Sequence, residues 1–504
     1  MRYALVLVTF FTFNFLSAQN EVDAIRYSQE NIGSTARSFA VGGAFGAVGA
    51  DPSSAAINPA GLAKYRTSKL YLSAAMFNAK NRTTFLGNEF SENKFNFNLP
   101  NIGLVVNIPG EDYLKKYATG FVNFVFAFNI NRLNNFHKRT ILDGTNTSNS
   151  ITQDWAERGT RGGLRPEEMS PYTLEYLAYN AFLIDPDTSS SVPAYKSAYG
   201  NAPINVNQSA SNISKGALND YNFSFAANYR HVLQAGLALG VKSARYIENI
   251  SFTETDIKAS NAKDIKKVTM DQFLKTYGLG FNAKIGLIFS PSEYLRLGFS
   301  YHSPTVFNMT DSYQYTLYPR FDFGAVDVTG KTRQNSITST NATSYKYKIT
   351  TPARQVVSLA LINKEMGFVS LDAEFVNYGT ANLFAKDYAF LSENRNISKN
   401  YNSVLNLRMG VEMIQDEFRI RAGYARYPSP YKKNLFPDMR SMVNNVYTLG
   451  FGIKTDEYSF DVAYVNSGYT DYYTPYTLEN NQHPVATNQV RTTNIVFTAG
   501  FNID

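Results

Sequence analysis

The chain has 504 residues, a formal net charge of +7 at pH 7 and no cysteine. The lack of cysteine excludes a small secreted domain held together by disulfides, and so modest a charge gives no reason to expect nucleic-acid binding. Outside the N-terminus no apolar run approaches the roughly 20 residues that a membrane-spanning helix needs, so a helical membrane protein is excluded as well.

Residues 1–18 have the pattern of a secretory signal peptide. Arg2 supplies the positive charge, residues 4–15 are apolar, and Leu16-Ser17-Ala18 forms a cleavage site of small residues before Gln19. We therefore predict that the protein leaves the cytoplasm. A large exported chain without disulfides needs another source of stability, and a closed β-barrel provides one because it leaves no strand edge unpaired.

Residues 19–66 differ in composition from the remainder of the chain. The stretch at 42–63, GGAFGAVGADPSSAAINPAGLA, is rich in small residues and almost uncharged. Its glycines allow close backbone contact, and it holds only a few large apolar side chains, among them Phe45 and Leu62. We predict that residues 19–66 form a compact hatch that lies inside a larger structure.

From Ser68 onward, apolar residues alternate with small or polar ones. In the last segment, for example, Phe497, Ala499 and Phe501 share one face, whereas Thr498 and Gly500 lie on the other. This period of two, with apolar residues facing outward, is typical of transmembrane β-strands. It predicts about fourteen strands, near residues 67–87, 93–108, 118–136, 217–231, 234–256, 275–290, 293–316, 341–363, 366–380, 401–413, 416–428, 444–455, 458–472 and 490–503.

The predicted connections alternate between short turns and long loops from the third strand onward. Outer-membrane barrels have this asymmetry, with tight periplasmic turns, long extracellular loops and an even number of strands. We therefore predict an all-β fold: an antiparallel transmembrane barrel of about 14 strands over residues 67–504, in the bacterial outer membrane and surrounded by its lipid. The long loops fall at 137–216, which is the largest, and at 257–275, 318–340, 380–400, 429–445 and 473–489.

Several short motifs, together with this order of elements, resemble the FadL/TodX family of outer-membrane transport proteins. The resemblance covers essentially the whole mature chain and is closest to the larger Bacteroidetes-type members, which are often labelled hemin receptors. The motifs are Asn58-Pro59-Ala60-Gly61-Leu62, Gly103-Leu104-Val105-Val106, Gly298-Phe299-Ser300-Tyr301-His302-Ser303-Pro304, Thr351-Pro352-Ala353-Arg354 and Arg421-Ala422-Gly423-Tyr424.

The resemblance implies a monomer that takes up hydrophobic small molecules passively, such as long-chain fatty acids or aromatic hydrocarbons, without a cofactor. It also implies that the hatch rearranges on ligand binding and that substrate leaves sideways through the barrel wall. From the family's motif, Asn58, Pro59 and Ala60 carry over as the gating residues. Pro59 fixes one backbone angle and Asn58 can bond neighbouring backbone, so the alternative is a simple helix-capping turn.

Two further groups of residues are candidates for substrate binding. Leu174, Leu177 and Phe182 lie at helical spacing in the largest loop, where an apolar face could capture a substrate or could pack into the loop's own small core. Arg408 and Arg421 are predicted to face the lumen. They could pair with a carboxylate ligand or brace the wall through ion pairs.

Signals for enzymatic chemistry are weak. The four histidines fall in separate strands and connections without metal-ligand spacing. The stretch at 278–283 matches a dinucleotide-binding pattern in its letters only, because it lies within a β alternation. We predict no enzyme activity, no metal, no cofactor and no nucleic-acid partner. Two alternatives to uptake stay open: a surface platform for a secreted protein, and a haem-binding receptor.

Overall fold

The computed structural model describes residues 21–30, 33–113, 115, 118–200, 204–257, 265–322, 326, 330, 332–335, 338–340, 343–432, 442–480 and 482–503. The predicted signal peptide at 1–18 lies outside the described residues. Within them, none of the helices has the length and apolar character needed to cross a membrane.

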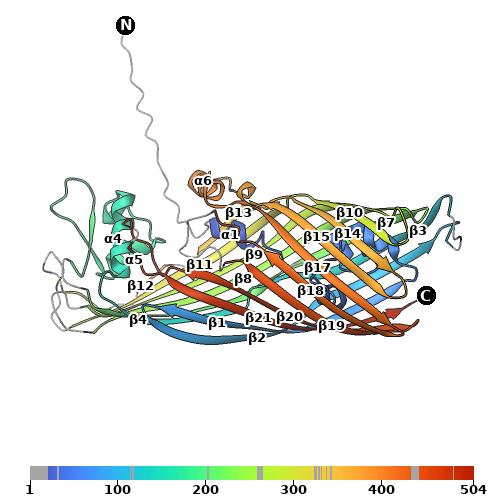
Figure 1. Cartoon of the computed structure of the whole chain (residues 1–504). Coiled ribbons are helices and arrows are strands. Elements are labelled where there is room, and N and C mark those ends of the chain that lie inside the picture. The colour runs from blue at the N-terminus through green and yellow to red at the C-terminus, as the bar shows by residue number, and fades with distance from the viewer. Residues whose placement is uncertain are drawn as a thin grey trace, which may run out of the picture.

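The strands form a closed antiparallel barrel (Figure 1). The first strand, β1 (Lys69–Phe85), pairs with β2 (Asn88–Pro109) on one side and with the last strand, β21 (Ala486–Asn502), on the other. The ring is thereby closed, and it has no free edge to pair with another chain. The predicted all-β barrel is confirmed, with fourteen wall strands among the described residues.

Several wall strands are interrupted, so the sheet of the described residues contains nineteen strand segments. The other segments are β3 (Phe121–Asn135), β4 (Lys138–Asn146), β7 (Val206–Tyr229), β8 (Leu233–Asp256), β9 (Ile265–Phe289), β10 (Leu295–His302), β11 (Val306–Phe321), β12 (Thr338–Ser339), β13 (Thr343–Thr350), β14 (Arg354–Asn363), β15 (Gly367–Asn377), β16 (Asn382–Phe384), β17 (Ser403–Gln415), β18 (Phe418–Tyr427), β19 (Asn444–Lys454) and β20 (Tyr458–Tyr473).

The helices are short and belong to two regions of the chain. Four lie in the N-terminal segment: α1 (Glu21–Arg26), α2 (Ala36–Ala40), α3 (Ser54–Ile57) and the 3₁₀ helix η1 (Pro59–Lys64). The others lie in the long connections: α4 (Ile151–Gly162), η2 (Pro166–Glu168), α5 (Leu174–Asn180), η3 (Tyr378–Thr380) and α6 (Leu391–Asn400), together with a two-stranded sheet of β5 (Ile184–Pro186) and β6 (Tyr195–Ser197).

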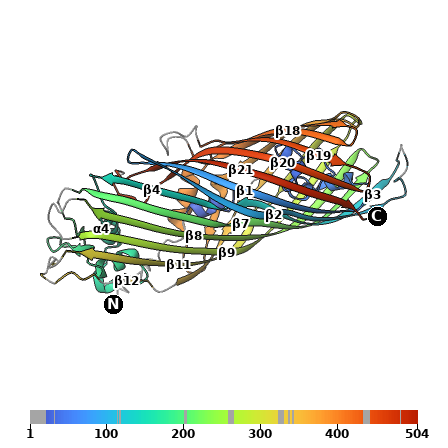
Figure 2. The same ribbon diagram turned by 90° about the horizontal axis from the view of Figure 1, so that it is seen from below.

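The barrel wall is much taller on one side than on the other (Figures 1 and 2). Strands β7, β8 and β9 have 24, 24 and 25 residues, whereas β18 and β19, on the opposite side of the ring, have 10 and 11. Parts of the long connections predicted at 137–216 and 257–275 are therefore strand. The period-two pattern missed these parts because it detects strands with one apolar face, and the wall here has water rather than lipid outside.

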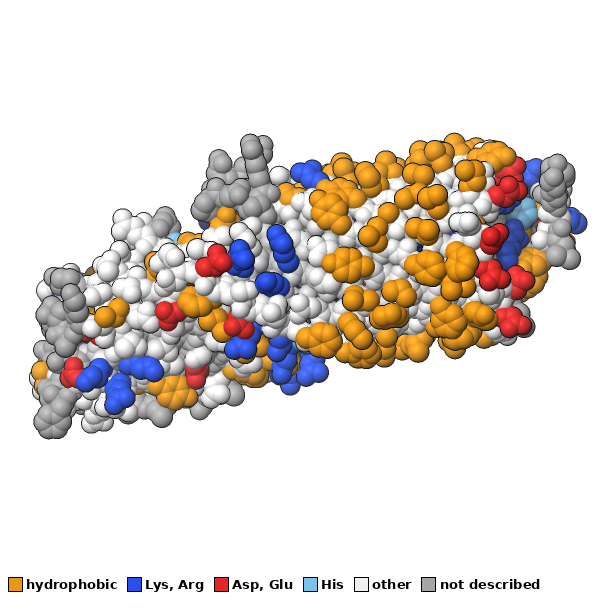
Figure 3. Space-filling view, turned by 60° about the horizontal axis from the view of Figure 1, so that its bottom comes forward, with side chains coloured by type: hydrophobic (Ala, Val, Ile, Leu, Met, Phe, Trp, Pro, Cys, Tyr) orange, Lys and Arg blue, Asp and Glu red, His pale blue; other side chains and the backbone are white. Residues whose placement is uncertain are grey.

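On the face drawn in Figure 3, exposed apolar side chains form a continuous band over one half of the barrel. Exposed apolar residues of the wall include Leu239, Phe281, Leu287 and Phe299. Charged side chains of both signs gather at the two borders of the band, and the rest of this face is mostly polar. A band of this kind faces the lipid in a transmembrane barrel.

The largest loop folds into a cap at the end of the barrel where the long connections lie (Figure 1). Helices α4 and α5 pack around the fully buried Trp155, and the same apolar cluster includes the wall residues Phe252 and Leu317. A buried ion pair between Asp185 Oδ2 and Arg333 Nη2, 2.7 Å apart, joins this loop to the connection that follows β11. The cap therefore has a folded core that it shares with the wall strands beneath it.

Three neighbouring wall strands are interrupted at the same level. The breaks fall at 303–305 between β10 and β11, at 351–353 between β13 and β14, and at η3 between β15 and β16. Pro304 and Pro352 lack the N–H group that a ladder bond requires. The single strands predicted at 293–316 and 341–363 are therefore each divided. Across the break, the Thr305 N–H donates to Thr351 Oγ1 (3.0 Å) and the Thr351 N–H donates to the Thr305 carbonyl (2.9 Å).

Candidate functional site

The N-terminal segment lies inside the barrel, and we call its described residues, 21–30 and 33–65, the lumenal segment. Its backbone bonds side chains on widely separated wall strands. The N–H groups of Ala36 and Gly46 donate to Thr498 Oγ1 of β21 (2.7 Å) and to Asp372 Oδ2 of β15 (3.0 Å). Because these strands lie far apart around the ring, the segment must sit in the lumen between them.

Wall glycines let the lumenal segment approach the strands at backbone distance. A Cβ atom on Gly286 of β9 would lie 1.9 Å from Asn58 Oδ1, and one on Gly236 of β8 would lie 2.3 Å from the Pro59 carbonyl carbon. Such distances leave no room for a side chain. The same holds where other wall glycines meet residues 40–52 of the segment, namely Gly103, Gly298, Gly410, Gly423 and Gly450.

Asn58, Pro59 and Ala60 join the lumenal segment to the wall. Asn58 Nδ2 donates to the carbonyls of Gly46 (2.7 Å) and of Leu287 in β9 (3.2 Å). Asn58 Oδ1 accepts from the Ala60 N–H (3.2 Å), and Pro59 is the first residue of η1. The motif therefore both caps η1 and attaches the lumenal segment to β9. Its gating role stays a prediction.

The two arginines predicted to bind substrate are both held in buried ion pairs. Arg408 Nη1 lies 2.7 Å from Glu374 Oε2. Arg421 bridges Glu412 Oε2 (2.5 Å) and Asp461 Oδ1 (2.6 Å). Glu412 also pairs with Arg37 of the lumenal segment, whose Nε lies 3.1 Å away. These contacts match the bracing interpretation, and substrate binding by either arginine stays a prediction.

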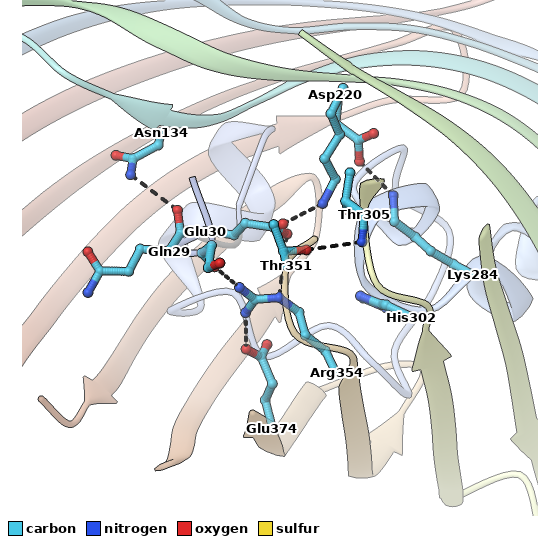
Figure 4. Close-up of polar contacts among 12 residues, drawn as sticks. Gln29, Glu30, Asn134, Asp220, Lys284, His302, Thr305, Thr351, Arg354 and Glu374 are labelled. Atoms are coloured by element: carbon cyan, nitrogen blue, oxygen red, sulfur yellow. Dashed lines mark hydrogen bonds and ion pairs between the residues drawn. The ribbon is translucent and has the colours of Figure 1, made fainter. Parts of the chain in front are cut away.

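The buried ion network of Arg408 and Glu374 continues beside the strand breaks (Figure 4). Lys242 Nζ of β8 donates to Glu30 Oε1, and Arg354 Nε of β14 lies 3.8 Å from Glu30 Oε2. Arg354 also bonds the Ser28 carbonyl and, at 2.7 Å, Glu374 Oε1. Burial by itself raises the pKa of Glu30, but the attraction of Lys242 and Arg354 outweighs it and lowers this pKa to about 2. Glu30 is therefore ionised at neutral pH.

An aromatic cluster surrounds α1 in the lumen. Ile25 and Tyr27 are buried, and the Tyr27 ring lies 6.5 Å from that of Phe307. The Arg26 guanidinium lies 4.0 Å from the ring centroid of Tyr246. Sequence reasoning missed this cluster because its members come from many strands. The wider cluster includes Leu274, Met309, Tyr313, Tyr347, Ile349, Tyr378, Phe390 and Tyr401.

Two adjoining cavities, each of about 160 Å³, border the lumenal segment. Phe39 lines one of them and Glu30 lines the other. Neither Arg408 nor Arg421 belongs to either lining. The two cavities share four lining residues, Asn134, Tyr427, Asn444 and Tyr469.

The three loop residues predicted to capture substrate lie in the cap. Leu174 and Leu177, on α5, are buried in the same cluster as Trp155, and Phe182 packs half-buried against it. Phe182 has a left-handed backbone, with φ of 58°. Because the first two side chains are covered, capture by this face would require the cap to open, and that role stays a prediction.

The histidines lie apart from one another. His302 Nε2 is 2.8 Å from the Ile57 carbonyl of the lumenal segment, and His137 contacts Asn135 and Asn96. Across the part of the chain that the structure describes, no three or more histidine or acidic side chains converge as a metal site would require.

The barrel is closed, and a band of apolar side chains covers part of its outer surface. These features define a transmembrane β-barrel protein. Its own lumenal segment occupies the channel. The chain belongs to the family described as outer membrane protein transport protein (OMPP1/FadL/TodX), which matches residues 211–502. The protein is accordingly an outer-membrane transport protein, and its family and structural relatives are transporters and channels rather than enzymes.

Solved structures share this fold at low sequence identity. A FadL homologue from Pseudomonas aeruginosa is 13% identical, with a TM-score of 0.54 over 94% of this chain and 98% of that one. The toluene transporter TodX of P. putida is 10% identical, with a TM-score of 0.51 over 94% of this chain and 99% of that one. No curated protein sequence matches the chain.

Proposed function

We propose that the protein is a monomeric channel for passive uptake of hydrophobic small molecules, either long-chain fatty acids or aromatic hydrocarbons. The observation that carries this proposal is the aromatic cluster around α1, which gives the lumen an apolar site beside two cavities. The transport family and the toluene transporter among the structural relatives support it. An apolar pocket with a few polar groups is the usual form of a small-molecule site.

The lumenal segment acts as the hatch in this proposal, with residues 19–66 as its bounds. Its buried contacts reach β9, β15 and β21, so a substrate passes only if part of the segment moves. Asn58, Pro59 and Ala60 act as the anchor, because they bond β9 and seat on wall glycines. The segment before them, including α1, is then the part that moves.

Substrate leaves the barrel sideways at the interrupted strands. The β10–β14 ladder ends at His302 and Arg354, and the β11–β13 ladder begins at Val306 and Thr350. Between the two ladders, the wall strands are joined by the two hydrogen bonds between Thr305 and Thr351. The exposed outward side chains of Val306 and Phe384 place apolar surface beside the break. A wall with few ladder bonds costs less to open than a continuous one, which supports this place for the exit.

Uptake by cells tests the proposal. Cells that lack a transporter of this kind would express the wild-type protein or the Asn58→Ala, Pro59→Ala double variant. We expect the wild type to accelerate uptake of radiolabelled palmitate or toluene but not of sucrose, and the variant to change that rate. Mass spectrometry of small molecules extracted from protein purified in mild detergent would identify the bound class. Absence of both uptake and bound apolar molecules would contradict the proposal.

The cap supports a second candidate function. It has a buried core around Trp155 and a buried ion pair to a second loop, so it presents a folded surface that a secreted protein could recognise. A protein that co-purifies with the wild type but not with a chain lacking residues 147–205 would favour this platform. Within the described residues, no feature favours the haem-binding alternative over uptake.

A further inference from the structure

We propose that the outer face of the tall side of the wall binds a phosphorylated glycolipid of the surrounding outer leaflet. The strands involved are β7, β8, β9 and β11, which lie side by side in Figure 2, and β13, which pairs with β11. Three kinds of surface follow one another along these strands, and each matches one part of such a lipid. This surface lies outside the barrel, so its ligand is distinct from any molecule that the lumen carries.

The first surface is the edge of the apolar band. On β9 the side chains at odd positions point outward, and those of Phe281, Leu279 and Tyr277 are 56%, 52% and 50% exposed. β9 runs from the end of the long connections toward a short turn, so Tyr277 is the member of this run nearest the long connections. Outward apolar side chains contact acyl chains, and a tyrosine at the edge of the band is typical of the membrane interface.

The second surface is a patch of five exposed cations along this edge. Arg245 of β8 is directly opposite Tyr277, Tyr277 is opposite Thr310 of β11, and Thr310 is opposite Lys346 of β13. Directly opposite residues face the same side of a sheet, so both cations point outward with Tyr277. Three strand spacings place them about 14 Å apart. The five residues, which we call the cation patch, are Lys215, Arg245, Lys275, Lys346 and Lys348.

The outward residues beside the cation patch carry no carboxylate. Two positions away along β7, β8, β9 and β13, each described outward residue is either neutral or another member of the patch. The outward residues of β11 between β9 and β13 are Asn308, Thr310 and Ser312. Clustered cations repel one another and attract anions, and lysine and arginine bind phosphate oxygens well. The patch therefore fits the phosphates of a lipid head group.

The third surface is a groove of about 410 Å³ beyond the cation patch, on the side away from the band. Its lining includes Phe273, which lies two positions beyond Lys275 on β9. Phe273 and Tyr318 are 39% and 37% exposed. Exposed rings give apolar faces on which a sugar ring can pack, and hydroxyl, amide and carboxylate groups bond its hydroxyls. The groove supplies these groups from Ser211, Asn249, Ser251, Asp271, Gln314 and Thr316.

The order of the three surfaces fixes the class of ligand. Acyl chains lie in the band, phosphates lie on the cation patch, and the saccharide extends into the groove. A phospholipid would fill the first two surfaces and leave the groove empty, whereas a free sugar or free phosphate would fill only one. The strands of the tall wall continue past the band and thereby place the groove where the saccharide of an outer-leaflet lipid lies.

Equilibrium binding of lipopolysaccharide with a short core saccharide to the purified protein in detergent tests the proposal. We expect Arg245→Gln, Lys275→Gln to weaken binding about thirtyfold, since each cation near an anionic lipid surface contributes about fivefold. The matched control is Lys267→Gln, Arg320→Gln. These two exposed cations lie opposite each other on β9 and β11, and Lys267 is about 26 Å along the strand from Lys275. The control removes the same charge and should change binding by less than about twofold.

Two comparison probes separate the phosphate from the sugar. Dephosphorylated lipopolysaccharide should bind as weakly to the wild type as the intact lipid binds to Arg245→Gln, Lys275→Gln. Phosphatidylglycerol, which has a phosphate but no saccharide, should bind more weakly than lipopolysaccharide. Phe273→Ser, Tyr318→Ser should weaken the binding of lipopolysaccharide and leave that of phosphatidylglycerol within about twofold.

This pattern would support the site. Equal losses in Arg245→Gln, Lys275→Gln and in the control would mean that any loss of positive charge weakens binding, and would overturn the site. Undiminished binding of the dephosphorylated probe would overturn the role of the cation patch. Equal affinity for phosphatidylglycerol, unaffected by Phe273→Ser, Tyr318→Ser, would reduce the surface to a general anionic-lipid contact and overturn the assignment to a glycolipid. Retained heat-modifiable migration on gels shows that each variant is folded.

Discussion

Asn58 and Pro59 pack directly against Gly286 of the wall. A substitution at Gly286 therefore tests whether this contact holds the lumenal segment in place. In Gly286→Ala the new Cβ would lie 1.9 Å from Asn58 Oδ1 and 2.9 Å from Pro59 Cδ. Asn58 must then shift, and its three hydrogen bonds at 2.7, 3.2 and 3.2 Å are lost or weakened. At about 1 kcal/mol for each bond the cost is about 3 kcal/mol, which is roughly a hundredfold in the docking equilibrium.

Thiol labelling measures this equilibrium, because the natural chain has no cysteine. Ser53 is a suitable reporter position, since it lies in the lumenal segment, is buried and has a side-chain oxygen without a hydrogen-bond partner. A Ser53→Cys protein should react slowly with a water-soluble maleimide. Addition of Gly286→Ala should raise the labelling rate by up to roughly a hundredfold, because labelling follows the population of the undocked segment.

Gly468→Ala is the matched control, because Gly468 is also a wall glycine but the nearest atom to its added Cβ lies 3.8 Å away. It should leave the labelling rate of Ser53→Cys unchanged. If Gly286→Ala labels no faster than Gly468→Ala, the motif does not hold the segment in its seat, and the anchor argument is refuted.

Three further predictions concern the ion networks and the cap. Arg421→Met should lower the free energy of unfolding by about 3–5 kcal/mol, because it leaves the buried Asp461 carboxylate without its cation. Thermal unfolding of the purified barrel measures this loss. Leu177→Ala should destabilise the cap by about 2–5 kcal/mol; limited proteolysis should then cut within residues 147–205 faster while barrel unfolding stays unchanged. The pKa of Glu30 is lowered from 4.5 to about 2, so its contribution to docking is complete above about pH 4.5 and is lost as the pH falls toward 2. Bilayer conductance should therefore stay constant from pH 5 to 8 and rise near pH 3, and a change between pH 5 and 8 would contradict this assignment.

The period of two determined the barrel from sequence alone. Each wall strand that crosses the apolar band has one face toward lipid and one toward the lumen. The side that a residue faces can therefore be inferred from its polarity, as with the outward Phe497 and the inward Thr498. Strand number and the alternation of connection lengths follow from the same pattern. Beyond the apolar band the outward side chains are polar, so the alternation of apolar and polar residues is lost there. The sequence therefore did not predict the outer halves of β7 and β9.

Long-range partners were decided only by the tertiary structure. Nothing near Arg421 in the sequence indicates that it meets both Glu412 and Asp461, and Gly286 is an ordinary strand glycine until Asn58 is placed against it. The sequence marked Asn58, Pro59 and Ala60 because a proline turn has a local signature. The sequence did not indicate the ion pairs of Glu30, because only closure of the barrel brings Lys242 and Arg354 to its carboxylate.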